Sequence, residues 1–395
     1  MLYNNCIEEL TGLKDIIVKE VKNIYGEQHL YAKMHKRIHT CPKCGGKTSK
    51  VHDYREQIIK DLSSFGQITY IHLNKRRHVC PICGKRFCEE IDFLPRYHRM
   101  TNRLYAYLTE QFLDISSIKH ISRKNNVSST TTMRIFDMIE YPKPNLPEVL
   151  SIDEFRGNAG GEKFQCILTD PQHKRVLDIL PERKSESLYA YFSSFDKAER
   201  EKVKYISIDM STLFRSVVKT CFPKAKIIAD KYHVVRQVTW ALDRVRKEEQ
   251  KKFSKDRRLH FKHSRQILLK PSQRLTTYEK EQLSVMLQAS DRIREAYLRK
   301  VEFEKVMHSK SSREAKRRLS KWIVLTQNSG IKEYQPCCST FIKWANEITE
   351  SLDHNITNGY TEGVNNKIKV LKRVSFGVKN FSRFRNRILH MMASQ

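Results

Sequence analysis

Two cysteine pairs near the N-terminus have the spacing of a metal-binding knuckle. Cys41-Pro-Lys-Cys44-Gly and Cys80-Pro-Ile-Cys83-Gly are near copies of one another. In each copy two residues separate the thiols, and the glycine that follows lets the backbone turn tightly around an ion. Two such turns supply the four thiolates of a tetrahedral zinc site that is closed to water and therefore structural. The alternative is four free cysteines with accidental spacing, and the duplicated pattern argues against it.

The other cysteines show no paired spacing: Cys6, Cys88, Cys166, Cys221, Cys337 and Cys338. In a reducing cytosol this usage favours a metal site over a framework of disulfides. Cys88 could compete for the metal because it lies shortly after Cys83, but we interpret it as a spare thiol.

Two aspartates interrupt apolar segments whose composition predicts β-strands. Asp153 lies within VLSIDEF (149–155), and Asp209 lies near the end of KYISIDM (204–210). Because side chains alternate along a strand, Asp153 and Glu154 are expected on opposite faces. A carboxylate in an apolar run is costly unless it is paired or binds a metal. We therefore expect the two aspartates to meet at a divalent-cation site on neighbouring strands.

A glutamate near the start of a predicted C-terminal helix completes the acidic set. Within residues 358–390 a helix is expected to start after Gly359, with Val364, Ile368 and Leu371 as its buried stripe. A second face combines one acid with amide and basic groups: Glu362, Asn366, Lys369 and Arg373. An acid in that company suits a metal ligand placed beside a DNA backbone.

Basic and aromatic side chains alternate through this C-terminal segment. The basic residues are Lys367, Lys369, Lys372, Arg373, Lys379, Arg383, Arg385 and Arg387, and the aromatic ones are Phe376, Phe381 and Phe384. This combination fits contact with DNA phosphates. The residues most strongly predicted to bind DNA here are Lys367, Lys369, Lys372 and Arg373.

The charge of the whole chain also indicates a polyanionic partner. Its 395 residues include 74 Lys and Arg against 44 Asp and Glu, a formal net charge of +30. Nucleic acid is the commonest partner that relieves such a charge, and a membrane surface is the rival. No segment approaches the roughly 18 apolar residues of a spanning helix, and the N-terminus lacks the features of a signal peptide. We therefore expect a soluble, intracellular protein.

The elements that must position these residues fall into several domains. Residues 13–38, around a turn at Tyr25-Gly26-Glu27, and residues 67–79 alternate between apolar and polar side chains. This alternation predicts a small antiparallel sheet, which joins the knuckles in a zinc-ribbon-like β module over residues 1–98.

Residues 99–146 predict a helix-turn-helix DNA-binding domain. A first helix ends near Lys124, a turn follows at Asn125-Asn126, and Ser128 or Ser129 caps the second helix. The apolar residues expected to seal the pair are Ile118, Ile121, Val127, Ile135 and Met138. The start of the second helix would present Ser129, Thr130, Thr131, Thr132 and Arg134 to base edges. A helical hairpin that only packs, without DNA, is the alternative.

The remaining chain predicts a mixed α/β sheet interrupted by helices. Short apolar runs rich in β-branched residues occupy residues 149–155, 164–170, 175–180, 204–210 and 225–230. A long, charged, helix-favouring stretch follows Tyr232. It is either a DNA-contacting insertion or a solvated helical hairpin. The expected divisions are a first core part at 147–239, a helical insertion at 240–335 and a second core part at 336–395.

The motifs, in their order along the chain, resemble those of a known family. The double knuckle and the helix-turn-helix are followed by SIDEF, SIDMS, ADKYHVVR and NGYTEGVNNKIKVLKR. This order resembles the insertion-sequence transposases of the ISL-three family, within the wider DDE group. The resemblance covers nearly the whole chain, and its last motif is the most specific. The family usually has an acidic or hydroxyl-bearing residue near position 88, where this chain has cysteine.

The resemblance implies a fold, cofactors and a reaction. The fold is multidomain α/β, with a ribonuclease H-like mixed-sheet core and a helical insertion between the second and third acids. Asp153, Asp209 and Glu362 match the catalytic triad and would hold two magnesium or manganese ions. The implied enzyme is a DDE-type transposase, which binds the terminal inverted repeats of an insertion sequence, cleaves DNA and transfers the strand to target DNA.

The resemblance also implies where and with what the protein acts. Its partner is double-stranded DNA, both the inverted-repeat ends and the target. Pairing two ends usually demands a homodimer or a larger assembly on DNA. The expected location is the prokaryotic cytoplasm, in association with the nucleoid.

Several polar residues near the predicted triad have more than one interpretation. Asp230 matches a family motif, and it is either an auxiliary acid or a buried cap of the next helix. We expect His233 to be packed, or to face a phosphate, rather than to bind a metal. Asp170 and Asp178 are expected to be surface or strand-end acids.

Two other functions are compatible with these residues. The first is a DNA-binding regulator with the same domains and a catalytically inactive core. The second is a nuclease of the same fold that cuts structured DNA or RNA without strand transfer. Metal-dependent nicking of a terminal repeat separates the enzyme from the regulator, and joined products separate the transposase from the nuclease.

Overall fold

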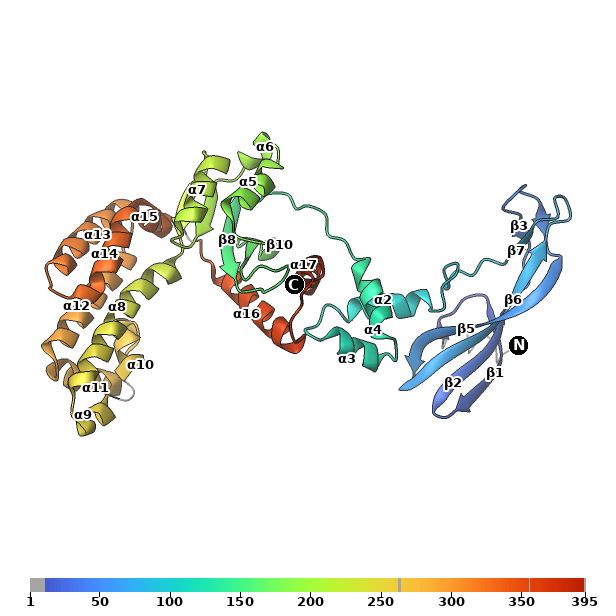
Figure 1. The fold of residues 1–395 in the computed structure, drawn as a ribbon, viewed down its shortest axis with the longest axis horizontal. Coiled ribbons are helices and arrows are strands. Elements are labelled where there is room, and N and C mark those ends of the chain that lie inside the picture. The colour runs from blue at the N-terminus through green and yellow to red at the C-terminus, as the bar shows by residue number, and fades with distance from the viewer. Residues whose placement is uncertain (1–10, 262–263, 355, 394–395) are drawn as a thin grey trace. The chain divides into compact units, whose positions relative to one another are not determined.

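The computed structural model describes residues 11–261, 264–354 and 356–393 (Figure 1). It divides into two compact units. The described parts of the first unit lie within residues 1–141, 370–377 and 386–394, and those of the second within 142–369 and 378–385. No described helix is both long and apolar enough to cross a membrane.

The N-terminal part of the first unit is built on a five-stranded sheet. The strands are β1 (Ile16–Ile24), β2 (Glu27–Met34), β5 (Val51–Ser64) and β6 (Gln67–Val79), in the order β1-β2-β6-β5, with β7 (Arg86–Cys88) added to β6. Two short strands, β3 (His39–Thr40) and β4 (Lys47–Thr48), pair with each other and carry the first knuckle. The buried side of the sheet includes Ile16, Leu30, Ile59 and Ile71.

The prediction of an antiparallel sheet is correct for three strand pairs, β6–β7 among them, and wrong for one. Both β1–β2 and β5–β6 are antiparallel, and the turn at Tyr25-Gly26 has positive φ at both residues. The strand β2, however, pairs with β6 in parallel. These two strands are joined through β3, β4 and β5 rather than by a hairpin, and so their relative direction could not be inferred from a local turn.

Three helices follow in the first unit: α2 (Asn102–Glu110), α3 (Ile118–Lys124) and α4 (Ser129–Asp137). The α3–α4 pair is the predicted helix-turn-helix, with Ser128 as the cap of α4 and Asn126 at positive φ in the turn. Its core includes Ile121, Val127 and Ile135. The predicted core position of Met138 is wrong, because Met138 is exposed. Phe136 is buried in its place, since it lies on the face of α4 that packs against Phe112.

A buried aspartate fastens these helices to the β module. Asp61 of β5 is almost fully buried and accepts a hydrogen bond of 2.7 Å from the Thr101 hydroxyl. The Arg103 guanidinium donates to the same carboxylate. Because Thr101 is also the N-cap of α2, the orientation of this helix is set by residues from both segments.

The second unit contains a five-stranded mixed sheet in the order β10-β9-β8-β11-β12. The strands are β8 (Val149–Phe155), β9 (Gln165–Asp170), β10 (Arg175–Leu180), β11 (Tyr205–Ile208) and β12 (Lys226–Ala229), all within the predicted runs. The pairs β10–β9 and β9–β8 are antiparallel, whereas β8–β11 and β11–β12 are parallel. The parallel half brings the ends of β8, β11 and β12 to one edge.

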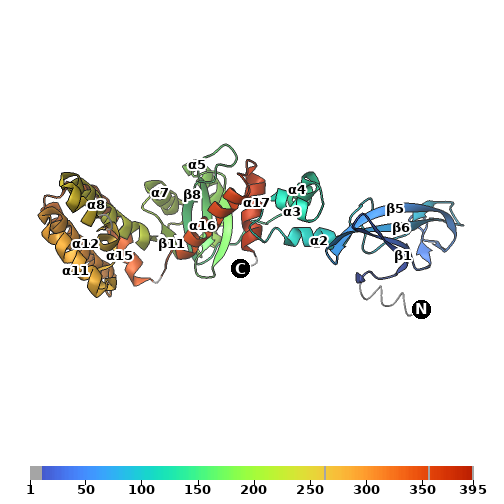
Figure 2. The same cartoon turned by 90° about the horizontal axis from the view of Figure 1, so that it is seen from below.

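Different helices cover the two faces of this sheet. The helices α5 (Ser185–Ser193) and α7 (Thr212–Cys221) bury apolar side chains against Leu150 and Ile152 of β8. The short α6 (Lys197–Arg200) connects α5 to β11. The opposite face receives α16 (Gly359–Val374) and the first turn of α17 (Phe381–Met392). Figures 1 and 2 show α5 and α7 on one side of the sheet and α16 on the other.

The helical insertion follows β12 and is longer than predicted. It comprises α8 (Lys231–Lys252), α9 (Lys255–His260), α10 (Ser264–Leu269), η1 (Ser272–Arg274), α11 (Thr277–Gln288), α12 (Asp291–Met307), α13 (Ser312–Gln327), η2 (Lys332–Tyr334), α14 (Gln335–Lys343) and α15 (Ala345–Asp353). Aromatic residues fill its centre, including Phe303, Trp322 and Phe341. The helices therefore continue past residue 335, and α15 returns to pack against β12.

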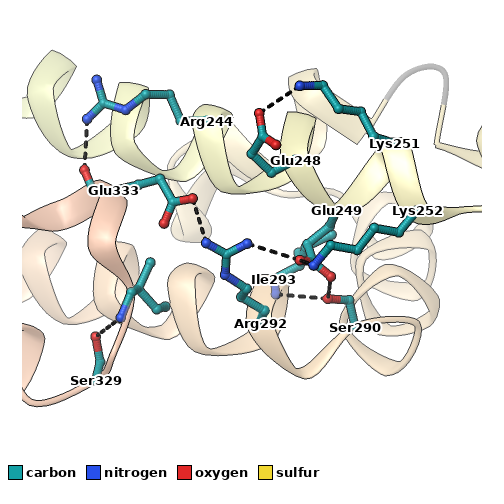
Figure 3. A network of polar contacts seen from close by, with 11 residues as sticks. Arg244, Glu248, Glu249, Lys251, Lys252, Ser290, Arg292, Ile293, Ser329 and Glu333 are labelled. Carbon is teal, nitrogen blue, oxygen red and sulfur yellow. Dashed lines mark hydrogen bonds and ion pairs between the residues drawn. The ribbon is translucent and has the colours of Figure 1, made fainter.

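Ion pairs connect the helices of the insertion. Arg292 of α12 lies between two carboxylates, 3.2 Å from Glu249 of α8 and 2.6 Å from Glu333 of η2 (Figure 3). Ser290 and Lys252 also contact Glu249. The charge-laced helices expected from the sequence are therefore present, with part of the charge used to join one helix to another.

Candidate functional sites

The four knuckle cysteines converge as the sequence predicts. The Cys41 and Cys83 sulfurs lie 3.6 Å apart, and those of Cys44 and Cys80 lie 3.5 Å apart. A zinc–sulfur bond of about 2.3 Å gives a tetrahedron whose sulfurs are about 3.8 Å apart. The four thiols therefore fit a zinc ion with little movement. Cys88 is exposed and is not part of this cluster.

Local backbone geometry forms each knuckle in the same way. The Gly45 N–H donates to the Cys41 carbonyl and the Gly84 N–H donates to the Cys80 carbonyl, and both glycines have positive φ. This is the tight turn for which glycine was expected. A β-carbon at Gly46 would lie 3.4 to 3.5 Å from two of the sulfurs, and so the chain passes close to the metal position.

The thiols of the cluster have unequal proton affinities. Burial would raise the pKa of Cys41, but the N–H groups of Lys43 and Cys44 outweigh it and lower this pKa to about 6. The N–H of Gly46 lowers the pKa of Cys44, but the neighbouring thiols raise it to about 12. Four thiolates this close repel one another, and a cation in their centre removes that cost. The donor set therefore fits structural zinc.

Three aspartates lie side by side across the parallel half of the core sheet. Ile152 pairs with Ile208, and Ile208 pairs with Ala229. In each strand the next residue is an aspartate, namely Asp153, Asp209 and Asp230. Because neighbouring strands lie about 4.8 Å apart, this register places the three carboxylates along one line of the sheet.

Glu362 reaches the same region from the first turn of α16. Its carboxylate, the Asp230 carboxylate and a ring nitrogen of His233 all lie within 4.8 Å of one another. The His233 Nε2 atom is 3.7 Å from Asp230 Oδ2. Asp230 Oδ1 accepts a hydrogen bond from the Tyr232 N–H and caps α8. The Oδ2 atom is buried, and Asn358 is a polar side chain that lowers the pKa of this carboxyl.

The predicted triad is not grouped as tightly as this second set. Asp153, Asp209 and Glu362 are not among the groups of described residues whose ligand atoms all lie within 4.8 Å of one another. Glu362 is grouped instead with Asp230 and His233, for which the sequence left a structural role open. From the sequence we expected His233 to pack or to face a phosphate, and not to lie beside two carboxylates as a possible metal ligand.

The charges of these acids act on one another. Burial, together with the charges of Asp209 and Asp230, raises the pKa of Asp153 to about 7. Burial, then the charges of Glu154 and Asp230, raises the pKa of Asp209 to about 6. Burial and the charge of Asp230 also raise the pKa of Glu362. Asp230 is therefore coupled to all three predicted triad members, and burial raises its own pKa as well.

A polar stripe on α16 and the residue before it was missed by the sequence analysis. Asn358, Thr361 and Asn365 are buried, and they follow one another at helical spacing beside the predicted apolar stripe. Asn358 accepts a hydrogen bond of 2.7 Å from the Ser151 hydroxyl, and the Asn365 amide donates to Asp153 Oδ2 at 2.9 Å. Polar residues at this spacing, next to a buried stripe, are the signal that could have identified them.

Two acids that were expected at the surface or at strand ends are buried. Asp170 ends β9, but it is fully buried and accepts hydrogen bonds from the Gln172 and His173 backbone N–H groups. Asp178 is buried and accepts from the Tyr191 hydroxyl and the Arg385 guanidinium. A surface position is therefore wrong for both acids, while the expected strand-end position is correct for Asp170. Local backbone N–H groups compensate the burial of Asp170, and Tyr191 and Arg385 compensate that of Asp178.

The residues predicted to contact DNA differ in exposure. On α4, Ser129, Thr130 and Arg134 are exposed and Thr131 is partly exposed. Thr132 is buried and donates its hydroxyl hydrogen to the Ser128 carbonyl, so it cannot face DNA. On α16, Lys369 and Arg373 are exposed, while Lys367 and Lys372 are partly exposed.

Two members of the C-terminal basic and aromatic run have structural roles. Arg387 is 4 % exposed and donates to the backbone carbonyls of Asp114 and Ser116. Phe384 is fully buried beside Phe155. The expectation of phosphate contact is therefore wrong for Arg387, and Phe384 belongs to the core.

This combination of modules defines a class of protein. A four-cysteine zinc ribbon, a helix-turn-helix and an acid-bearing mixed sheet follow one another, as in DNA transposases. Family comparison agrees for each part. A transposase model matches residues 150–388, a zinc-finger model of the IS204/IS1001/IS1096/IS1165 transposases matches 37–83, and the helix-turn-helix model of transposase family ISL3 matches 89–139.

The chain therefore belongs to the ISL3 (ISL-three) family of transposases. It is 27 % identical over 359 residues to the transposase for insertion sequence element IS1001 of Bordetella parapertussis, covering 89 % of this chain and 88 % of that protein. It is 24 % identical over 241 residues to the transposase for IS1557 of Mycobacterium tuberculosis, covering 55 % and 54 %. The protein is a DNA transposase with a DNA-binding helix-turn-helix, and an inactive regulator is not favoured.

Proposed function

We propose that this transposase cleaves the ends of its insertion sequence and transfers the freed strand to target DNA, with Asp153, Asp209 and Glu362 as the metal-binding catalytic acids. The alignment of Asp153 with Asp209 on adjacent parallel strands, with α16 packed beside them, carries this proposal. The strand order, with the first acid on the central strand and the third on a later helix, supports a ribonuclease H-like core.

The donor set fits divalent magnesium or manganese. All three groups are carboxylates, which are the hard oxygen ligands that these ions prefer. The raised pKa values of Asp153 and Asp209 mark sites where negative charge is poorly solvated, as expected where a cation is to be bound. When bound there, two such ions would activate the attacking oxygen and stabilise the leaving oxygen.

The protein side chains then have defined tasks. The Glu154 N–H and the Asn365 amide each donate to one oxygen of Asp153, which fixes the carboxylate and leaves both oxygens able to accept further contacts. In the first step a water oxygen would attack phosphorus as the bond to the DNA 3′-oxygen breaks. The freed 3′-hydroxyl would then attack a phosphodiester of the target, and the target's own bond from phosphorus to its 3′-oxygen would break, which releases a target 3′-hydroxyl. Neither step needs a covalent bond between protein and DNA.

DNA binding is assigned to two separate surfaces. On α4, Ser129, Thr130, Thr131 and Arg134 would read the terminal repeat in the major groove. Lys367, Lys369, Lys372 and Arg373 of α16 would contact phosphates. Since both ends of an element must be cut and joined, we propose a homodimer or larger assembly on DNA, acting at the nucleoid.

The test separates catalysis from binding. Asp153→Asn, Asp209→Asn and Glu362→Gln should each lower magnesium- or manganese-dependent cleavage of a labelled inverted-repeat DNA by on the order of 1,000-fold, with end binding retained. Arg134→Ala should instead weaken end binding by about 10-fold or more. Glu186→Gln is a matched control, because Glu186 is an exposed acid on α5 on the other side of the sheet.

Each outcome assigns or removes a role. A triad variant that cuts at the wild-type rate loses its assignment. Wild-type protein that binds the ends but never cuts with either ion would restore the regulator hypothesis. Cleavage without joined donor and target products would favour the nuclease.

A further inference from the structure

A second cluster of metal-ligand side chains lies behind the zinc knuckles. His39, His78 and Glu89 are all buried, at 7 %, 1 % and 4 % exposed, and one ligand atom from each lies within 4.8 Å of the others. They come from three different strands or their ends, since His39 is on β3, His78 is on β6 and Glu89 directly follows β7. The two imidazole centres are 4.4 Å apart.

The two histidines occupy equivalent positions in the duplicated motif. Each lies two residues before the first cysteine of a knuckle, so the repeat extends to His-x-Cys-Pro-x-Cys-Gly at residues 39–45 and 78–84. The sulfurs of the two knuckles lie next to one another. Because each histidine has the same position relative to its knuckle, the His39 and His78 rings are also neighbours. The zinc-finger family match covers both histidines, but Glu89 lies outside it.

The polar atoms of this cluster lack partners. Four buried atoms accept or donate no hydrogen bond within the described chain, namely His39 Nε2, His78 Nδ1, His78 Nε2 and Glu89 Oε2. Buried polar groups are normally satisfied, so several unpaired atoms facing one another indicate a bound species between them. Imidazole nitrogen and carboxylate oxygen are zinc ligands.

Another group in the same sheet provides an internal comparison. His29, His72 and Glu56 also form a His-His-Glu set, but His29 Nδ1 is 2.8 Å from His72 Nε2, and His72 Nδ1 is 2.8 Å from Glu56 Oε1. These side chains bond to one another and lie partly in solvent. The polar atoms of His29, His72 and Glu56 therefore satisfy one another, whereas several of those in His39, His78 and Glu89 have no partner among the described residues.

The ion pair between Arg76 and Glu89 satisfies only some of the polar atoms in the buried cluster. The Arg76 N–H donates to Glu89 Oε1 at 2.7 Å, and the Arg76 Nη1 atom is 3.7 Å from Glu89 Oε2. The Arg76 guanidinium itself donates to the carbonyls of His35 and Met34. Arginine therefore explains one oxygen of Glu89, but it leaves His39 Nε2 and both ring nitrogens of His78 without a hydrogen-bond partner among the described residues.

We propose that His39, His78 and Glu89 form a second zinc site, separate from the four-thiolate site. Glu89 would bind through Oε2, and the fourth position would be filled by water or by closer approach of Oε1. The ligand atoms would have to move together by about 1 Å or more, because zinc–nitrogen bonds are about 2.0 Å long. The ion would join β3, β6 and β7 at the point where the chain leaves for the helix-turn-helix.

The test counts metal ions in the full-length protein. Protein purified without a histidine tag should contain two zinc ions per chain by mass spectrometry of the metal. His39→Gln, His78→Gln and Glu89→Gln should each reduce this to one. His72→Gln is the matched control and should retain two, because His72 belongs to the self-satisfied group.

Spectroscopy identifies which ion is lost. Cobalt bound to thiolates gives strong sulfur-to-cobalt charge-transfer absorption, which the three variants should retain in full. Wild-type zinc X-ray absorption should require nitrogen or oxygen ligands in addition to sulfur, and the variants should fit sulfur alone. Wild-type protein with one zinc and an all-sulfur shell overturns the proposal.

A folding defect in one variant does not prevent a decision. If His78→Gln loses both ions through misfolding, Glu89→Gln provides the test of the second site. Glutamine keeps the oxygen that accepts the Arg76 N–H, so this variant should fold. Retention of two ions in all three variants also overturns the proposal.

Discussion

The thiolate cluster fits a zinc ion and the acid cluster is proposed to bind magnesium or manganese, but the two groups of ligands are assembled differently. The thiols come from two short copies of one turn, and their sulfurs already lie 3.5 to 3.6 Å apart within each of two pairs. The acids come from β8, the ends of β11 and β12, and α16, and only Asp230, His233 and Glu362 lie within 4.8 Å as a group.

The difference follows from what each site must do. A structural zinc site is complete with protein ligands and gains from being closed. A site for phosphoryl transfer must leave coordination positions for DNA oxygens, so its carboxylates cannot all close on one ion. Tight grouping therefore indicates a structural role in the first unit, and looser grouping with raised pKa values is compatible with catalysis in the second.

The largest effect is expected from breaking the thiolate cluster. Cys80→Ser removes a buried ligand, and structural zinc contributes on the order of 10 kcal/mol to the folding of small zinc modules. We expect loss of zinc, rapid proteolysis within the β module and loss of specific end binding in a gel-shift assay.

The control for this prediction is Cys88→Ser, since Cys88 is exposed and outside the cluster. Melting of the second unit should be unchanged in both variants. Normal zinc content and normal end binding in Cys80→Ser would contradict the conclusion that tight grouping of ligands indicates a structural metal site.

An intermediate effect is expected at Asp230, the acid coupled to all three triad members. Asp230→Asn should lower DNA cleavage by roughly 10- to 100-fold, because it removes charge next to Glu362 while retaining a side chain that caps α8. Cleavage rates on the labelled repeat measure this.

If Asp230 served only as the cap of α8, Asp230→Asn would leave DNA cleavage unchanged. Asparagine is as good an N-cap as aspartate, and so the variant would cleave normally and melt at the wild-type temperature. Asp230→Ala, which removes both the cap and the charge, then shows how much of any loss comes from the cap.

The third prediction concerns the pH dependence of cation binding at the acid cluster and needs no substitution. The pKa values of Asp153 and Asp209 are raised to about 7 and about 6, above the unfolded value near 3.9. Without a cation, their contribution to stability is greatest below about pH 4 and falls as the pH rises through 6 to 7. Binding of magnesium requires their deprotonation, so its affinity should be on the order of 100-fold weaker at pH 5.5 than at pH 8.

This can be measured by the rise in melting temperature on titration with magnesium at each pH. Asp153→Asn should reduce both the rise and its pH dependence. A magnesium effect that is equal at pH 5.5 and pH 8 would contradict the raised pKa values.

Much of this protein is determined by local sequence. Strand segments such as 149–155 and 175–180 are recognisable because apolar, β-branched runs are bounded by turn residues. The knuckles are equally local, since two cysteines and a glycine within a few residues impose the turn. The caps at Ser117 and Ser128 define where α3 and α4 begin.

Only the tertiary structure decided how these parts meet. Three features depend on partners far along the chain: the parallel pairing of β2 with β6, the burial of Asp178 and the interior position of Arg387. The position of Asp230 beside Glu362 and that of His39 beside His78 also depend on segments that are far apart in the sequence. Backbone turns are set by neighbouring residues, but the partner of a buried polar group is set by which strands and helices pack together.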